Sequence, residues 1–200
     1  TLLIRAYSPR KADIIGSTRD DAAGEAFDKA AALLGLDYPG GPAIEEAARE
    51  GDPAGFDLPR GMIHSGDYDF SFSGVKTALR YLIDGIKSEG RAVPVADLAA
   101  SFQAAVVDVL VKKLADAVSE TGPETIVVGG GVVRNRLLVS RIREEFASRQ
   151  SRLLISSPDL CSDNAAMVAG CAFTRLKRGD SDSLRIDADP GLPWGNGLFF

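Results

Sequence analysis

Histidine and cysteine are scarce in this 200-residue chain, which has one histidine and two cysteines. Zinc and similar metals are usually held by several such side chains, and we interpret His64 as an exposed loop residue rather than a ligand. Cys161 and Cys171 lie ten residues apart, without the short spacing of a metal-binding pair. We expect both to be reduced thiols in a cytoplasmic protein, and Cys161 to pack as a small apolar side chain.

Long apolar runs and an excess of positive charge are also missing. No run approaches the roughly 18 residues that a membrane span requires, and the stretch from Thr1 to Tyr7 is too short for a signal peptide. Lys and Arg number 23 against 28 Asp and Glu, which gives a net charge of −5. We therefore expect no membrane partner. No global basic field indicates nucleic acid, although a local patch would suffice.

The composition that is present belongs to an ordinary globular protein, since 45% of the residues are hydrophobic. That share is enough for one compact domain or two small ones. A βαβ arrangement is expected near the C-terminal end, after a helical block at about 20–120. Hydrophobic periodicity predicts strands at 1–7, 125–128 and 152–156, an extended segment at 68–73, and helices at 20–34, 43–49, 75–86, 94–118, 137–148 and from about 161.

The stretch from Thr125 to Asn135 joins a short buried strand to a helix through three consecutive glycines. Glycines permit a tight turn and a close backbone approach to a ligand, and the free N–H groups of a helix start bind anions. These features indicate a nucleotide site with Gly130, Gly131 and Asn135 as contacts. The alternative is an ordinary β-to-α turn.

The first predicted helix is rich in carboxylates. Asp20 and Asp21 are expected in its first turn, where the helix dipole favours negative charge by about 0.3–1 kcal/mol. Asp21, Glu25 and Asp28 are spaced by four and three residues, which places them on one helix face. That face is either an acidic stripe exposed to solvent or a site where a carboxylate accepts hydrogen bonds from ribose hydroxyls, with Gly41 shaping the pocket wall.

Asp163 lies at the expected start of the last helix. Ser162 or Asp163 is expected to be its N-cap, a role compatible with metal binding, although one carboxylate does not make a metal site. We expect the small residues that follow to pack this helix closely against a sheet or another helix: Ala165, Ala166, Ala169, Gly170 and Ala172.

A basic cluster follows the glycines and consists of Arg134, Arg136, Arg141 and Arg143. Two interpretations stay open at this point. The cluster is either a surface that meets phosphate or a solvated helix face whose arginines pair with Glu144 and Glu145.

Five motifs, in order and over most of the chain, resemble those of one family. They include Asp-Phe-Ser-Phe-Ser-Gly-Val-Lys-Thr at 69–77 and Cys-Ser-Asp-Asn-Ala-Ala-Met at 161–167, and the others lie at 20–42, 99–103 and 128–135. The chain resembles the universal tRNA threonylcarbamoyladenosine transferase family, formerly described as glycoproteases or O-sialoglycoprotein endopeptidases. The resemblance implies an α/β fold of the actin-like ATPase (ribonuclease H-like) type, here a lobe with a mixed sheet flanked by helices and a helical insertion.

The resemblance also implies an activity, in which threonylcarbamoyl moves from threonylcarbamoyl-AMP to the exocyclic amine of the adenosine adjacent to the tRNA anticodon. The implied partners are tRNA, the adenylate or ATP as ligand, and other subunits of the threonylcarbamoylation complex, including a paralogous dimer partner. The implied cofactor is a divalent metal, with iron expected and zinc or magnesium as alternatives.

At positions that match the family's motifs, the resemblance implies that Asp28 holds the ribose and that Gly41 and Asn135 contact the adenylate. Glu45 lies near a further substrate-contact position, and Asp163 matches the acidic metal ligand. No catalytic residue is identified, because no strong general base is visible in the chain.

The sequence departs from the family in the other metal ligands, which are two histidines in an H-x-x-x-H helix. No such motif is present, and the family's Ser-Gly-Gly-His loop would end just before Thr1. We therefore expect residues 1–200 to be the C-terminal lobe of a longer protein, without its N-terminal lobe. The ending at 189–194 also departs from the family's usual one.

Three other functions compete with the transferase. A non-catalytic interaction lobe, like the paralogous partner, would be expected to lose Asp28, Asn135 and Asp163, and all three are present. A peptidase would need a nucleophile beside a histidine or the zinc-protease helix motif, and neither is visible. A sugar or acetate kinase of the same fold is disfavoured by the resemblance of the run at 69–74.

Overall fold

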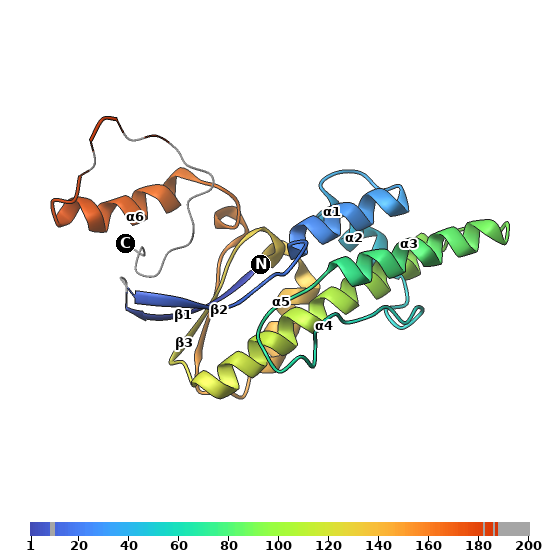
Figure 1. The fold of residues 1–200 in the computed structure, drawn as a ribbon, viewed down its shortest axis with the longest axis horizontal. Coiled ribbons are helices and arrows are strands. Elements are labelled where there is room, and N and C mark those ends of the chain that lie inside the picture. Colours follow the sequence, from blue (N-terminus) through green and yellow to red (C-terminus); the bar gives the residue numbers. More distant parts are fainter. Residues whose placement is uncertain (9–10, 182, 186, 188–200) are drawn as a thin grey trace.

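The computed structural model describes residues 1–8, 11–181, 183–185 and 187 (Figure 1). Its strands are β1 (Leu2–Ser8), β2 (Lys11–Ser17), β3 (Thr125–Val128) and β4 (Arg152–Ile155). Its α-helices are α1 (Ala23–Leu34), α2 (Gly40–Ala47), α3 (Ser73–Ser88), α4 (Val95–Thr121), α5 (Arg136–Phe146) and α6 (Ala165–Lys177). Short 3-10 helices are η1 (Ala48–Glu50), η2 (Gly131–Arg134) and η3 (Pro158–Leu160).

The strands form two small sheets flanked by helices. β1 pairs with β2 in an antiparallel hairpin, and β3 pairs with β4 in parallel, with Thr125 opposite Arg152. The strand–helix–strand order of β3, α5 and β4 confirms the predicted βαβ arrangement. The expected single mixed sheet is corrected, because the two pairs share no hydrogen-bonded strand in the described part of the chain.

Two hydrophobic cores meet along α4. Helices α1 to α4 bury the larger one, in which the rings of Phe27 and Phe102 pack edge to face at 5.6 Å between centroids. The βαβ unit buries the smaller one, where Ile142 and Phe146 of α5 pack with Val107 and Val118 of α4. In Figure 1, α4 runs from the helical part of the molecule to the end near β3. The long helix predicted after Pro94 is therefore confirmed and joins both cores.

Asp20 and Asp21 precede α1, which begins three residues later than predicted. The carboxylate of Asp20 instead accepts the backbone N–H groups of Phe72 at 2.8 Å and Ser73 at 3.2 Å, at the start of α3. Desolvation raises the pKa of Asp20, but hydrogen bonds from the Ser71 hydroxyl and from these two N–H groups outweigh it and hold the pKa below its ordinary value. Asp20 is thus a helix cap, but for α3.

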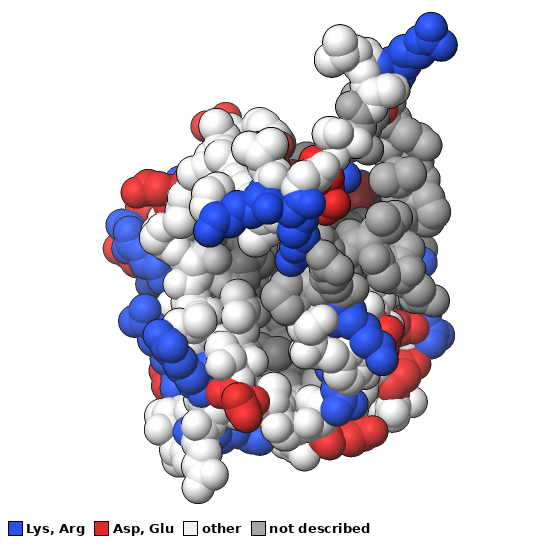
Figure 2. All heavy atoms as spheres, turned by 90° about the vertical axis from the view of Figure 1, so that its left-hand side faces the viewer, with Lys and Arg blue, Asp and Glu red and all other residues white. Residues whose placement is uncertain are grey.

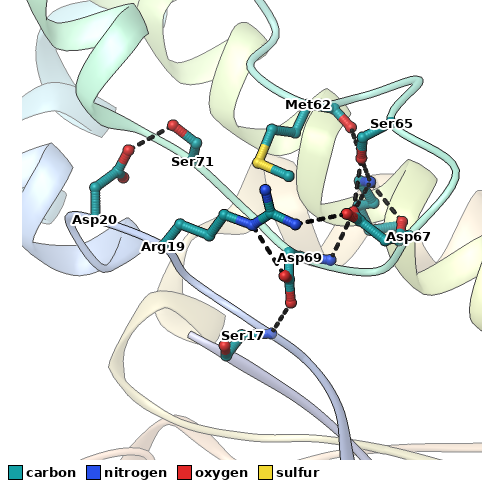
Figure 3. Close-up of polar contacts among 9 residues, drawn as sticks. Ser17, Arg19, Asp20, Met62, Ser65, Asp67, Asp69 and Ser71 are labelled. Carbon is teal, nitrogen blue, oxygen red and sulfur yellow. Dashed lines mark hydrogen bonds and ion pairs between the residues drawn. The ribbon is translucent and has the colours of Figure 1, made fainter.

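The segment 67–73 also supplies a carboxylate, which accepts hydrogen bonds from the end of β2 and the residues after it. Asp69 accepts the N–H of Ser17 at 2.9 Å and the Nε of Arg19 at 3.0 Å (Figure 3). Phe70 makes a single parallel bridge with Thr18. The predicted burial of alternate residues is confirmed, since Phe70 and Phe72 are each 1% exposed. The segment forms one bridge and not a strand.

A buried lysine fixes the loop that leads into this segment. Lys113 of α4 is 1% exposed, and its Nζ donates to the Ser65 hydroxyl at 2.8 Å and to the Asp67 carbonyl at 2.6 Å. The Asp67 carboxylate also pairs with Arg19 at 2.8 Å. A hydrogen bond from Ser65 is the largest influence that lowers the pKa of Asp67. Buried ammonium groups require such partners.

Helix α6 differs from the expectation in two respects. Its N-cap is Asn164, whose side chain accepts the Met167 N–H at 2.8 Å. Neither Ser162 nor Asp163 has that role, because Asn164 is the residue with extended backbone directly before the helix. None of its residues is buried in the described chain, so the predicted close packing of its small residues is wrong here. Its exposed apolar side chains are Met167, Val168, Phe173 and Leu176.

Figure 2 shows the end of the molecule that faces left in Figure 1, where α6 and the β1–β2 hairpin lie. Acidic and basic side chains are mixed on this face, with uncharged surface between them. This arrangement agrees with a modest net charge of −5 and gives no one-sided field. Among the described helices, none has the length and apolarity that would carry it across a bilayer.

Replacing the cap of α3 by Asp20→Ala is expected to lower the free energy of unfolding by about 1–2 kcal/mol, because N–H groups at a helix start lose their acceptor. Urea unfolding at pH 7 measures this loss. Asp37→Ala is the control, since Asp37 is exposed, and its effect should stay within about 0.5 kcal/mol.

The same variant should show a defined pH dependence. The pKa of folded Asp20 lies below its ordinary value of 3.8, so the ionised group stabilises the fold above that pH. This contribution is lost as the pH falls through the folded-state pKa. The difference between parent and Asp20→Ala should therefore be full at pH 7 and shrink below pH 3.8; a constant difference would contradict the capping role.

Candidate functional site

The consecutive helices α1 and α2 and the start of the distant helix α5 meet around four of the predicted site residues. Asp28 of α1 accepts the N–H of Gly40 in α2 through Oδ1, at 2.8 Å. Arg136 is the first residue of α5, and its N–H donates to Glu45, further along α2, at 2.7 Å. Because Gly41 follows Gly40 and Asn135 precedes Arg136, these contacts bring Asp28, Gly41, Glu45 and Asn135 into one region.

Asn135 closes this region from the α5 side. Its Oδ1 accepts the Leu138 N–H at 2.9 Å, so it is the N-cap of α5, and its Nδ2 donates to the Gln103 Oε1 at 2.8 Å. Both amides are buried, at 8% and 7% exposure. Gln103 therefore fixes the orientation of Asn135. This role was not predicted, although Gln103 lies in one of the motifs that resemble the family.

The glycine turn lies beside Asn135 and is open to solvent. Gly129, Gly130 and Gly131 are all exposed, and Gly130 has a φ of 99°, which strongly favours glycine. The N–H groups of Gly129 and Gly130 make no hydrogen bond within the described chain. The helix predicted at 137–148 is confirmed as α5, and the short helix η2 lies between the glycines and its start. The turn thus offers backbone donors separately from the α5 N-terminus.

Two of the acidic residues near α1, Asp21 and Glu25, are paired with lysines and do not form an open acidic face. Asp21 lies before the helix and is held between Lys29 at 2.6 Å and Lys76 at 2.7 Å. The hydrogen bond from Lys29, then that from Lys76, holds the pKa of Asp21 below its usual range. Glu25 pairs with Lys29. The predicted stripe is therefore wrong for Asp21, and Lys76, which had no assigned role, links α3 to this loop.

Asp28 keeps one carboxylate oxygen available. Its Oδ1 accepts the Gly40 N–H, whereas Oδ2 makes no hydrogen bond or ion pair within the described chain. The side chain is partly exposed. An ionised carboxylate accepts through both oxygens, so Asp28 can accept a ligand hydroxyl while it stays fixed to α2.

The two glycines at the start of α2 have different surroundings. A Cβ atom added to Gly40 would lie 2.4 Å from the Cα of Asp28 and 2.6 Å from the carbonyl oxygen of Phe27. A Cβ atom added to Gly41 would meet nothing within 4 Å. Gly40 therefore permits the close contact of α1 with α2, and the sequence analysis missed it. The space beside Gly41 is open, and its role in a pocket wall stays a prediction.

Asp163 is not brought to this region by any contact. It is exposed, and its carboxylate makes no hydrogen bond or ion pair within the described chain. The described residues contain no group of three or more His, Cys, Asp and Glu side chains that could hold a metal. His64 is exposed and Cys161 is buried, with its Sγ 3.3 Å from the Ser157 carbonyl oxygen, as both were predicted.

Substitution of the two glycines should separate packing from ligand contact. Gly40→Ala is expected to lower the free energy of unfolding by about 1–3 kcal/mol, because backbone atoms of α1 must move. Gly41→Ala is the matched control and should leave stability unchanged or raise it by up to about 1 kcal/mol, the gain of Ala over Gly in a helix. Urea unfolding of both variants measures this, and equal effects would contradict the packing assignment.

The sequence model of the TsaD family, described as tRNA N6-adenosine threonylcarbamoyltransferase, matches residues 1–170. A relative of that name from Desulfitobacterium hafniense is 47% identical over 91% of this chain, and one from Bacillus cereus is 45% identical over 90%. These matches cover 53% and 52% of the relatives, so the chain spans about half the length of the curated relatives it matches.

A solved structure, that of HypF from T. kodakarensis, resembles the fold with a TM-score of 0.54 and 20% identity. The similarity covers 79% of this chain and 20% of HypF, and at that identity it concerns the fold alone. Family membership follows from the sequence matches, which cover most of the chain. This chain belongs to the TsaD family of tRNA N6-adenosine threonylcarbamoyltransferases.

Proposed function

We propose that this chain forms the adenylate-binding lobe of a tRNA N6-adenosine threonylcarbamoyltransferase. The reaction transfers threonylcarbamoyl from threonylcarbamoyl-AMP to the exocyclic amine of the adenosine adjacent to the tRNA anticodon. One observation carries the proposal: the region where Asp28 keeps a free carboxylate oxygen also contains Gly41 and Asn135, the residues that family resemblance assigns to the adenylate. Because relatives are about twice as long, the activity belongs to the longer protein.

The actin-like ATPase fold is part of this proposal. The parallel β3–β4 pair with its connecting helix, the glycine turn between them and the helices of α1 to α4 support a nucleotide-binding lobe. In parallel α/β units, ligands commonly bind beyond the carboxyl ends of the strands. The exposed Gly129 to Gly131 turn lies directly after β3, which is such a position.

Each residue has a defined chemical task in this proposal. The free Oδ2 of Asp28 accepts a ribose hydroxyl, and the exposed turn of Gly130 and Gly131 contacts the adenylate, with the unbonded N–H of Gly130 as a donor. Glu45 acts as a positioning residue, because its Oε1 is bonded to the α5 backbone. The chain mainly orients the adenylate, and positioning alone contributes several kcal/mol to such transfers. No residue of the chain is assigned as the general base.

The divalent metal implied by the family does not fit the described residues by themselves. Asp163 offers one exposed carboxylate, and no described group supplies three or more ligands, whereas zinc and iron sites use several. Iron, or else zinc or magnesium, bound to Asp163 is therefore proposed only with further ligands from outside these residues. No catalytic step is derived through it.

Partners follow from the same proposal: tRNA, the adenylate, and other subunits, including a paralogous dimer partner, in the cytoplasm. The exposed apolar side chains of α6, such as Val168 at 64% and Leu176 at 74% exposure, support a protein contact. They also favour the second candidate function, a non-catalytic interaction lobe. Adenylate binding distinguishes the two, because only the transferase lobe requires it.

The test is calorimetric titration of the chain with a non-hydrolysable threonylcarbamoyl-adenylate analogue. Asp28→Asn should weaken binding about ten- to a hundredfold, because a hydrogen bond to a charged group is lost while Asn can still accept the Gly40 N–H. Glu25→Gln, on the same helix but paired with Lys29, is the control and should leave the affinity unchanged. An affinity insensitive to Asp28→Asn would sink the assignment.

A further inference from the structure

Arginines beside the candidate site have no acidic partner. Four of them are exposed and make no ion pair in the part of the chain that the structure describes: Arg134 in η2, and Arg136, Arg141 and Arg143 in α5. Several arginines elsewhere have a carboxylate within 4 Å, for example Arg80 with Asp84 and Arg91 with Glu89. The cluster next to Asn135 therefore stands out because it gathers four exposed arginines without an ion pair in one stretch of the described chain.

The acids that could neutralise these arginines are engaged elsewhere. Glu145 pairs with Arg149 at 2.8 Å, and Glu144 accepts the Ser140 hydroxyl at 2.8 Å. Glu45 accepts the backbone N–H of Arg136 rather than its guanidinium. The solvated face of the alternative interpretation is therefore confirmed, since all four arginines are exposed, whereas its ion pairs with Glu144 and Glu145 do not form in the described chain.

The local charge is opposite to that of the whole chain. Residues 134–149 contain five arginines and two glutamates, which gives +3, whereas the chain carries −5. Arg136 and Arg143 are seven residues apart, so they lie on one face of α5 about 10 Å apart along its axis. Arg141 instead lines the groove between α4 and α5, with Lys112 and Asp116. The surface set is therefore Arg134, Arg136 and Arg143.

Guanidinium groups without protein partners suit phosphate, which they bind with parallel hydrogen bonds. Arg134 and Arg136 adjoin Asn135 in the chain, and Arg143 continues the same face of α5, so a polyanion that follows this face reaches the region of Asn135 where the adenylate is proposed to bind. We propose that Arg134, Arg136 and Arg143 bind backbone phosphates of the RNA acceptor and hold it beside the adenylate. This inference rests on the proposed function and deepens it by locating an RNA contact surface.

The experiment measures binding of an unmodified tRNA transcript, with adenosine adjacent to the anticodon, by fluorescence anisotropy over a series of salt concentrations. The variant is R134Q/R136Q/R143Q, which removes three charges. The matched control is R49Q/R80Q/R91Q, which removes three exposed arginines that have acidic partners. The slope of log K against log salt should fall in magnitude by about 2–3 for the first variant, at 0.7–0.9 per phosphate contact, and by much less for the control.

Adenylate titration of the same variants separates this inference from the proposed function. An unchanged salt slope in R134Q/R136Q/R143Q, or no RNA binding by a parent that binds the adenylate, would overturn the RNA surface and leave the adenylate site standing. Arginine-dependent RNA binding without adenylate binding would support the surface and overturn the proposed site. Competition by polyglutamate is the last test. If polyglutamate competes as well as tRNA at equal charge, the RNA surface is overturned, because the arginines would then serve an acidic protein partner.

Discussion

The segments 17–21 and 67–73 each supply one carboxylate that accepts hydrogen bonds from the other segment. These contacts determine how the helical part of the molecule is joined to the β1–β2 hairpin. Asp20 accepts N–H groups at the start of α3, and Asp69 accepts the Ser17 N–H and the Arg19 side chain. Each segment thus satisfies backbone N–H groups of the other, and partly buried backbone donors require such acceptors. Since α1 begins directly after the first segment, the position of Asp28 depends on this exchange.

Hydrogen bonds from polar side chains also connect the helices around the candidate site. Asp28 holds α1 to α2, Glu45 holds α2 to α5, and Asn135 holds α5 to Gln103 of α4. Each contact pairs a polar side chain with a group from another helix. These contacts fix the relative positions of α1, α2, α4 and α5. In the proposed function, a region ordered in this way would lose less entropy when it binds the adenylate.

Much of the fold could be predicted from the sequence because hydrophobic spacing is a local property. The periodicity placed α3, α4, α5 and the βαβ unit within a few residues of their observed bounds. Capping was less predictable: Asp20 and Asp163 are both good caps, yet a distant helix uses the first and Asn164 replaces the second. Gly40 and Gln103 were missed because their reasons, a 2.4 Å approach and an amide pair, exist only between elements. Family resemblance supplied Asp28 and Asn135, which local pattern alone left ambiguous.

The burial of Lys113 has a practical consequence for studies of this chain. The other lysines, Lys11, Lys29, Lys76, Lys87, Lys112 and Lys177, are exposed or partly exposed, whereas Lys113 is covered by the loop at 65–67. Acylating reagents and trypsin therefore reach Lys113 only when that loop separates from α4. The adjacent Lys112 provides an internal reference on the same helix turn. The ratio of modification at these two neighbouring amines would report local opening directly, in a single mass spectrum.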